Sequence, residues 1–105
     1  MSSKYFTQNR IESVYMRLYW KQKKKGIDLI VENDEGDTFS VGGVRDTKRG
    51  IEALAKTTGY DPGRAVKGLG SMEEGRTFVE QFEPWRVFFP GDPLTVESDI
   101  APIEQ

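Results

Sequence analysis

The chain has 105 residues with no cysteine and no histidine, and its 15 Lys plus Arg against 17 Asp plus Glu give a formal net charge of −2. These absences exclude disulfides, thiolate and imidazole catalysis, and zinc sites built on Cys or His. The length suits one domain, no apolar run approaches the ~18 residues of a membrane span, and no signal-peptide stretch follows Met1, so we expect a soluble cytoplasmic protein without membrane contact.

The first predicted element is a helix over residues 9–25. Asn9 can cap it, and Glu12 stands at the third helical position, as in a capping box. Apolar residues recur at the spacing of one helical face, at Ile11, Val14, Tyr15, Leu18 and Tyr19. Lysines in the last turn suit the helix dipole, and Gly26 provides a stop. A strand is the alternative, because apolar residues also alternate, at Val14, Met16, Leu18 and Trp20.

The next predicted element is an antiparallel hairpin. Residues 27–32 are rich in Ile, Leu and Val, and residues 38–41 form a second β-type run. Residues 33–36, with the sequence Asn-Asp-Glu-Gly, have the composition of a turn between two strands. Gly42 and Gly43 are expected to end the hairpin.

Two helical segments are predicted after the hairpin. Asp46 can cap a helix that ends at Gly59. Its inward-facing residues are Ile51, Leu54 and Ala55. Asp61 and Pro62 then begin a short helical turn that runs to Val66, since Pro suits a first helical position.

A further helix and two short strands complete the prediction. Ser71 and Glu74 have capping-box spacing at the start of a helix that Pro84 closes. Residues 86–89 and 94–97 are expected to be strands, separated by a turn rich in Pro and Gly.

The predicted fold class is α+β. A small antiparallel sheet, made of the hairpin plus one or two C-terminal strands, carries an N-terminal helix and two or three short helices packed on one face. Residues 1–97 are expected to form a single compact domain, and residues 98–105 a loose acidic tail.

Charge is distributed unevenly along the chain. Residues 1–25 hold seven cations and one anion, and residues 26–44 hold five anions and no cation. Residues 45–67 hold six cations and three anions, whereas residues 68–105 hold two cations and eight anions. Such blocks often mark a directional surface, and the alternative is that they neutralise one another across the fold.

The basic blocks predict contact with the nucleic-acid backbone. On the predicted N-terminal helix, four cations fall within a narrow arc: Arg10, Arg17, Lys21 and Lys24. Lys23 and Lys25 would assist them, and Arg45, Lys48 and Arg49 would join if the fold brings the two basic blocks together. Such a ridge displaces counterions from phosphates and attracts nucleic acid without reading its bases. A solvated basic face on a core helix is the alternative.

A second hypothesis is a protein–protein interaction module, such as an adaptor or an inhibitor of the phage or mobile-element type. Its anchors would be large apolar side chains that the core does not need: Met16, Trp20, Trp85, Phe88 and Phe89. Acidic segments would complement a basic partner, and self-association is a variant of this idea. The alternative for each anchor is a place in the core.

Nothing in the sequence indicates an enzyme. Without His and Cys a general base must be Asp, Glu, Lys or Tyr, and no carboxylate pair stands in an apolar context. The acidic turn around Gly36 does not match a calcium-binding loop, and the loop at 68–71 lacks the lysine of a phosphate-binding motif. We therefore expect a non-catalytic protein with no cofactor and no metal site.

Overall fold

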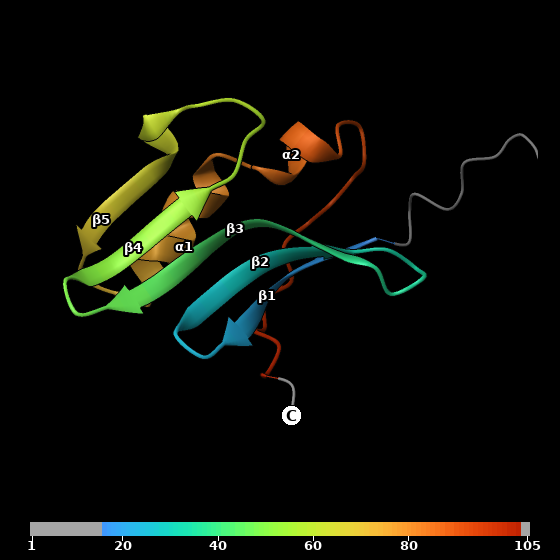
Figure 1. Ribbon diagram of the computed structural model, residues 1–105. Helices are drawn as coiled ribbons and strands as arrows, with labels where there is room; N and C mark the ends of the chain where they lie inside the picture. The colour runs from blue at the N-terminus through green and yellow to red at the C-terminus, as the bar shows by residue number, and fades with distance from the viewer. Residues whose placement is uncertain (1–15, 104–105) are drawn as a thin grey trace, which may run out of the picture.

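Five antiparallel strands follow one another in a meander, each paired with the next, in the computed structural model, which describes residues 16–103 (Figure 1). The strands are β1 (Arg17–Lys23), β2 (Gly26–Glu32), β3 (Thr38–Thr47), β4 (Gly50–Ala55) and β5 (Ala65–Leu69). A 3-10 turn, η2 (Pro62–Arg64), precedes β5, and the helices α1 (Met72–Gln81) and α2 (Trp85–Phe88) follow it.

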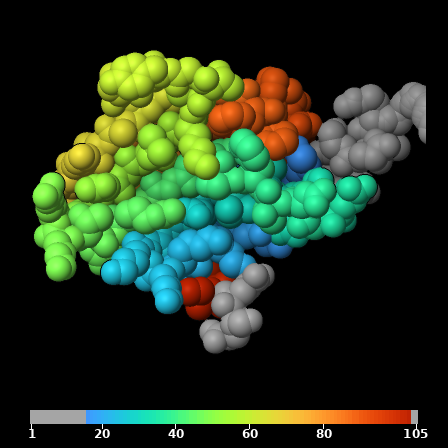
Figure 2. Space-filling view, in the orientation of Figure 1, coloured from blue at the N-terminus to red at the C-terminus, as the bar shows by residue number. Residues whose placement is uncertain are grey.

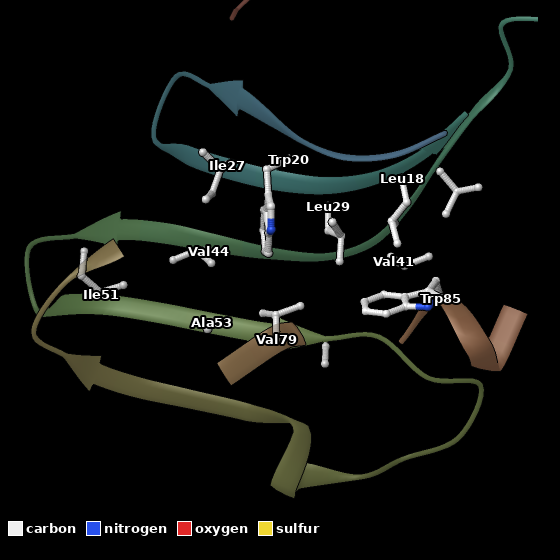
Figure 3. Packing of buried hydrophobic residues seen from close by; sticks show 12 residues of the cluster. Leu18, Trp20, Ile27, Leu29, Val41, Val44, Ile51, Ala53, Val79 and Trp85 are labelled. Atoms are coloured by element: carbon white, nitrogen blue, oxygen red, sulfur yellow. The ribbon is translucent and has the colours of Figure 1, made fainter. Parts of the chain in front are cut away.

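The core lies between one face of the sheet and the two C-terminal helices (Figure 3). Alternate residues of the strands point into it: Leu18, Trp20, Ile27, Leu29, Val31, Val44, Ile51, Ala53 and Ala55. Val79 of α1 and Trp85 of α2 close the core from the other side. Since burial of one large apolar side chain contributes roughly 1.5–3 kcal/mol, this single layer of contacts dominates the stability of the domain.

Helix α1 is fixed at its start and pressed closely against the sheet. Ser71 Oγ accepts a hydrogen bond from the Glu74 amide at 3.1 Å, and Glu74 Oε1 accepts one from the Gly70 amide at 2.9 Å. Gly75 faces the sheet so closely that a Cβ there would collide with a methyl group of Val44. The absence of a side chain at Gly75 therefore allows the helix to pack this closely against β3.

The segment after α2 runs along the outer edge of β1. Isolated parallel bridges join Leu18 to Val96 and Lys21 to Ala101. The Ala101 amide donates to the Trp20 carbonyl at 2.8 Å, and the Ala101 carbonyl accepts from the Gln22 amide at 2.8 Å. Ala101 belongs to the segment predicted as an acidic tail, and here it covers the polar edge of a strand.

The predicted arrangement of an N-terminal helix and several helices on a small sheet is wrong. Residues 17–23 of the predicted helix 9–25 form β1, and residues 9–15 lie outside the described residues. The strand alternative is correct for this stretch, because Leu18 and Trp20 reach the same core while Tyr19 between them lies on the other face of the sheet. Pairing with the strongly apolar β2 outweighs the local helix signals, which are the capping residue, the apolar helical face and the terminating glycine.

The predicted helix from Asp46 to Gly59 is also wrong. Thr47 and Gly50 pair across a tight turn, and β4 follows, with Ile51, Ala53 and Ala55 turned inward. Gly42 and Gly43 do not end the hairpin, because β3 continues through them after an irregularity in its pairing with β2.

At the C-terminal end, residues 86–89 are not a strand. Residues 85–88 form α2, which Pro84 begins with a helical φ of −63°. In the expected strand 94–97, only Val96 forms a bridge. The β2–β3 hairpin and the Ser71 cap are present as predicted. The helical turn after Asp61 forms but ends at Arg64, because Val66 already belongs to β5.

Candidate nucleic-acid interface

Two basic turns lie at the same end of the sheet. Lys24 and Lys25 connect β1 to β2, and Lys48 and Arg49 connect β3 to β4. In an antiparallel meander alternate turns fall at the same end, and both are seen at the left of Figure 1. The fold thus brings together parts of the two basic blocks that lie about twenty residues apart in the sequence.

A backbone contact fixes the first turn beside β3. The Asp46 amide donates a hydrogen bond to the Lys25 carbonyl at 2.8 Å. The chain comes so close here that a Cβ on Gly26 would collide with the Val44 carbonyl oxygen. Glycine at this position therefore allows the lysine turn to lie directly against the strand that leads to the second turn.

The second turn is held by hydrogen bonds to the side chain of Thr47. Thr47 Oγ1 donates a hydrogen bond to the Gly50 carbonyl at 2.7 Å and accepts one from the Arg49 amide at 3.2 Å. Gly50 has a φ of +110°, a conformation that favours glycine. Lys48 and Arg49 are consequently presented on a rigid loop.

We call the exposed cations at these two turns the turn cluster, which consists of Lys23, the last residue of β1, together with Lys24, Lys25, Lys48 and Arg49. Between residues 16 and 103, none of the five forms an ion pair within 4.0 Å. The turns project from one end of the molecule in the space-filling view (Figure 2). The cluster is therefore accessible to an external anion.

A broad hollow of about 950 Å³ lies beside the turn cluster, between the turns and α1. Lys24, Lys25 and Lys48 line it. It is not uniformly basic, because carboxylates of Asp46, Glu52 and Glu73 line it together with Arg45 and Arg76. Its lining is mostly charged and polar, unlike the predominantly apolar lining of a small-molecule pocket.

Arg45 belongs to the same end of the sheet, but its charge is balanced inside the fold. Its Nη2 lies 2.8 Å from Asp28 Oδ1. Its Nη1 donates to the carbonyls of Ile27 and Val44, at 3.2 Å each. This guanidinium holds two strands together and is a poor candidate for phosphate contact.

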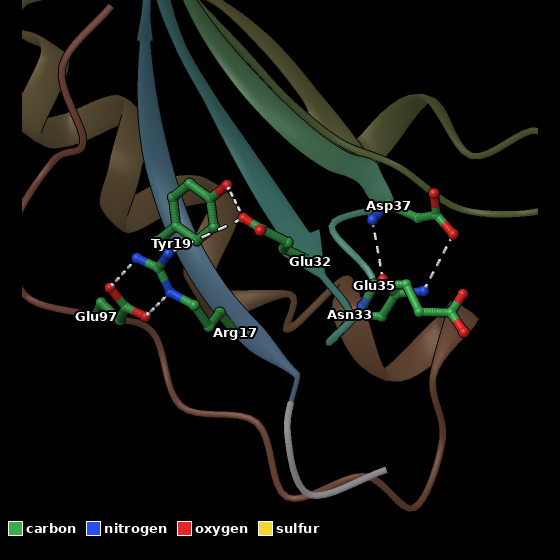
Figure 4. A network of polar contacts seen from close by, with 7 residues as sticks. All are labelled: Arg17, Tyr19, Glu32, Asn33, Glu35, Asp37 and Glu97. Atoms are coloured by element: carbon green, nitrogen blue, oxygen red, sulfur yellow. Dashed lines mark hydrogen bonds and ion pairs between the residues drawn. The ribbon is translucent and has the colours of Figure 1, made fainter. Parts of the chain in front are cut away.

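Arg17 is balanced more completely, in a network at the opposite end of β1 (Figure 4). Its Nε and Nη2 donate to both carboxylate oxygens of Glu97, at 2.8 and 2.9 Å. Its guanidinium lies 4.4 Å from the Tyr19 ring centroid and 3.9 Å from Glu32. These hydrogen bonds lower the pKa of Glu97 and raise the pKa of Arg17, so both charges persist at neutral pH.

The predicted basic ridge along a helix does not form. Lys21 lies within β1 opposite Asp28 and has an interaction partner of its own, so it is not counted in the turn cluster. Arg10 lies outside the described residues. The structure gathers Lys23, Lys24 and Lys25 with Lys48 and Arg49, and it separates Arg17 from them.

The indoles predicted as alternative partner anchors are buried. Trp20 is 0% exposed, and its Nε1 donates to Glu80 Oε2 at 2.7 Å. Trp85 is 6% exposed and packs in the core. Phe88 and Phe89 are half-buried. The interaction hypothesis therefore loses both tryptophans as surface anchors.

Other predicted anchors lie at the margin of the core. Met16 is half-buried against it, and Phe88 and Phe89 contact Phe39 edge to face, with centroid distances of 5.0 and 5.9 Å. Three large apolar side chains that the sequence does not mark as functional are exposed: Phe39, Leu54 and Tyr60. The prediction that Leu54 faces inward is wrong. If residues 50–55 are taken as a strand, alternation places Leu54 on the face opposite Ile51 and Ala53, and this pattern would have predicted its exposure.

Comparisons with protein-family models, with curated proteins and with solved structures find no match to this chain. Within residues 16–103 no helix has both the length and the apolar character needed to cross a membrane. Nor do acidic residues in this part of the chain gather in a group of three or more that suits a metal ion.

Proposed function

We propose that this chain is a non-catalytic protein that binds the nucleic-acid backbone through the turn cluster. The observation that carries the proposal is the convergence of five exposed cations from two rigid turns, none of them ion-paired in residues 16–103. Because the side chains lie on turn tips, they reach phosphates without a helix or strand entering a groove.

Binding of this kind is governed by counterion release. Five phosphate contacts on duplex DNA predict a slope of about −4.5 for the logarithm of the association constant against the logarithm of salt concentration. Affinity should then fall about 500-fold between 50 and 200 mM salt. Sequence preference should be weak, since cations on turn tips contact phosphates and no helix or strand carries them into a groove where base edges are read.

The test is fluorescence anisotropy with labelled single- and double-stranded oligonucleotides over a range of salt. The double variant Lys24→Gln/Lys48→Gln removes one cation from each turn. We expect its salt slope to fall by about two and its affinity at 50 mM salt to fall at least ~10-fold, because two phosphate contacts are lost.

The matched control removes the same charge elsewhere, as Lys56→Gln/Arg86→Gln, since both side chains are exposed and lie away from the two turns. It should change affinity less than about twofold. Absence of binding by the unmodified chain at low salt, or equal losses in the two double variants, would overturn the proposal.

A further inference from the structure

A second surface lies at the end of the sheet opposite the turn cluster. An apolar groove of about 490 Å³ is formed between the β4–η2 loop and α2. Phe39, Leu54, Tyr60, Pro62 and Phe88 are among its lining residues. The exposed fractions of Phe39, Leu54 and Tyr60 are 43%, 45% and 93%. Contiguous exposure of this kind in a small domain points to a binding surface.

Contacts within the fold hold both walls of the groove in place. Phe39 is held by edge-to-face contact with Phe88. On the other side, Arg64 donates from Nε to the Ala55 carbonyl and from Nη2 to the Lys56 carbonyl, at 3.1 Å each. These bonds tie the loop that carries Tyr60 to the end of β4. Because the walls are preformed, a ligand would not have to order them on binding.

Acidic residues adjoin one wall of the groove. Asp61 lines the groove, and the β2–β3 turn, which directly precedes Phe39 in the chain, carries Asp34, Glu35 and Asp37 outside the lining. None of these four forms an ion pair with another residue in 16–103. Lys56 is the single cation among the described lining residues. At the groove itself Lys56 and Arg64 offset Asp61, so it is the β2–β3 turn that attracts positive charge.

We propose that this groove binds a basic segment of a partner protein, which inserts a large apolar side chain between Leu54 and Tyr60 and lays its cations along the acidic β2–β3 turn. The apolar anchor supplies affinity, and the charges supply orientation and rate of association. This surface is independent of the turn cluster and does not depend on the proposed nucleic-acid binding.

A second copy of the chain is a weaker fit. The basic turns of another copy would meet the acidic turn, but residues 23–25 and 47–50 contain only Lys, Arg, Thr and Gly. They offer no large apolar side chain to fill the groove. The partner we infer carries both features in one segment.

The test is selection of random displayed peptides of about 12 residues on the full chain, with Leu54→Ser/Tyr60→Ser as the counter-selection target. We expect enriched peptides to combine at least one large apolar residue with a net charge of about +3 or more. Their synthetic forms should bind the Leu54→Ser/Tyr60→Ser variant at least ~10-fold more weakly than the unmodified chain.

Ile100→Ser/Ile103→Ser is the matched control, because these side chains are 40% and 41% exposed and do not line the groove. It should change peptide affinity less than about twofold, whereas Asp34→Asn/Glu35→Gln should weaken binding about threefold at low salt. Circular dichroism checks that every variant folds, which the exposure of the substituted residues favours.

Three results would overturn the proposal. The first is no enrichment over the counter-selection target, and the second is a consensus that is neutral or acidic. The third is a concentration-dependent mass in light scattering that Leu54→Ser/Tyr60→Ser abolishes, since a second copy would then occupy the groove. The Lys24→Gln/Lys48→Gln variant should bind the peptides normally, which separates this test from that of the turn cluster.

Discussion

At the scale of single residues, the structure divides the cations by their neighbours. Arg17 and Arg45 stand on strands, where a carboxylate lies within 2.8 Å and the planar guanidinium can use several donors at once. The lysines of the turn cluster stand at or beside the turn tips, and within residues 16–103 none of them lies within 4.0 Å of a carboxylate oxygen. The functional distinction between a structural arginine and a ligand-binding lysine thus follows from position in the meander.

The Arg17–Glu97 pair gives a pH-dependent prediction. Because the folded pKa of Glu97 is lowered from its ordinary value near 4.5, the pair stabilises the protein above that pH and loses its effect as pH falls through the folded pKa. Glu97→Gln should therefore reduce the free energy of unfolding at pH 7 by about 1 kcal/mol or less, as both side chains are well exposed.

Urea denaturation at several pH values measures this effect. The difference between the unmodified chain and Glu97→Gln should shrink as the pH falls below 4.5. Asp99→Asn, at an exposed position two residues away, is the control and should show no such trend. A difference that stays constant down to acid pH would assign the effect of the substitution to packing.

At the scale of elements, the sequence predicts the structure correctly where residues close in the sequence determine it. The Asp61 and Ser71 caps form within four residues, and the β2–β3 hairpin needs only a turn between two apolar runs. The helix predictions for residues 17–23 and 50–55 are wrong because the conformation of these residues depends on pairing with other strands. Leu18 and Trp20 fit either a helix or a strand until β2 is known to lie beside them.

The same dependence on distant contacts hid the two surfaces. From the sequence, the turn cluster can be predicted only if the fold brings the two basic blocks together. The sequence does not show which turns lie at the same end of the sheet. The exposure of Leu54 follows from β4 having one buried face, which a helical reading of the same residues obscures.

Helix α1 supplies a prediction about packing. Gly75→Ala should lower the free energy of unfolding by about 1–3 kcal/mol, because the new Cβ collides with Val44 although alanine favours helix by about 1 kcal/mol. Thr77→Ala, at an exposed site of the same helix, should stabilise slightly. Urea denaturation of both variants decides the matter, and a stabilised Gly75→Ala protein would show that α1 has room to move away from β3.

At the scale of the whole molecule, the meander separates two kinds of surface. Its alternate turns place cations at one end, and the β2–β3 turn and the groove place acidic and apolar groups at the other. The seven residues of β2 span about 23 Å between these ends. This separation exceeds two Debye lengths at physiological salt, so each end should sense its own ligand with little influence from the other.

The two proposals together therefore predict a ternary complex. At 150 mM salt, a saturating oligonucleotide should change the affinity of a selected basic peptide by less than about twofold, because the peptide and the phosphates occupy opposite ends of the sheet. At 10 mM salt the Debye length grows to about 30 Å, and the bound oligonucleotide should then strengthen peptide binding through its negative charge. Isothermal titration of the peptide into the chain, with and without oligonucleotide, measures both conditions. Mutual exclusion at 150 mM would mean that the two ligands share one site. The proposal that the peptide and the nucleic acid bind at opposite ends of the sheet would then be wrong.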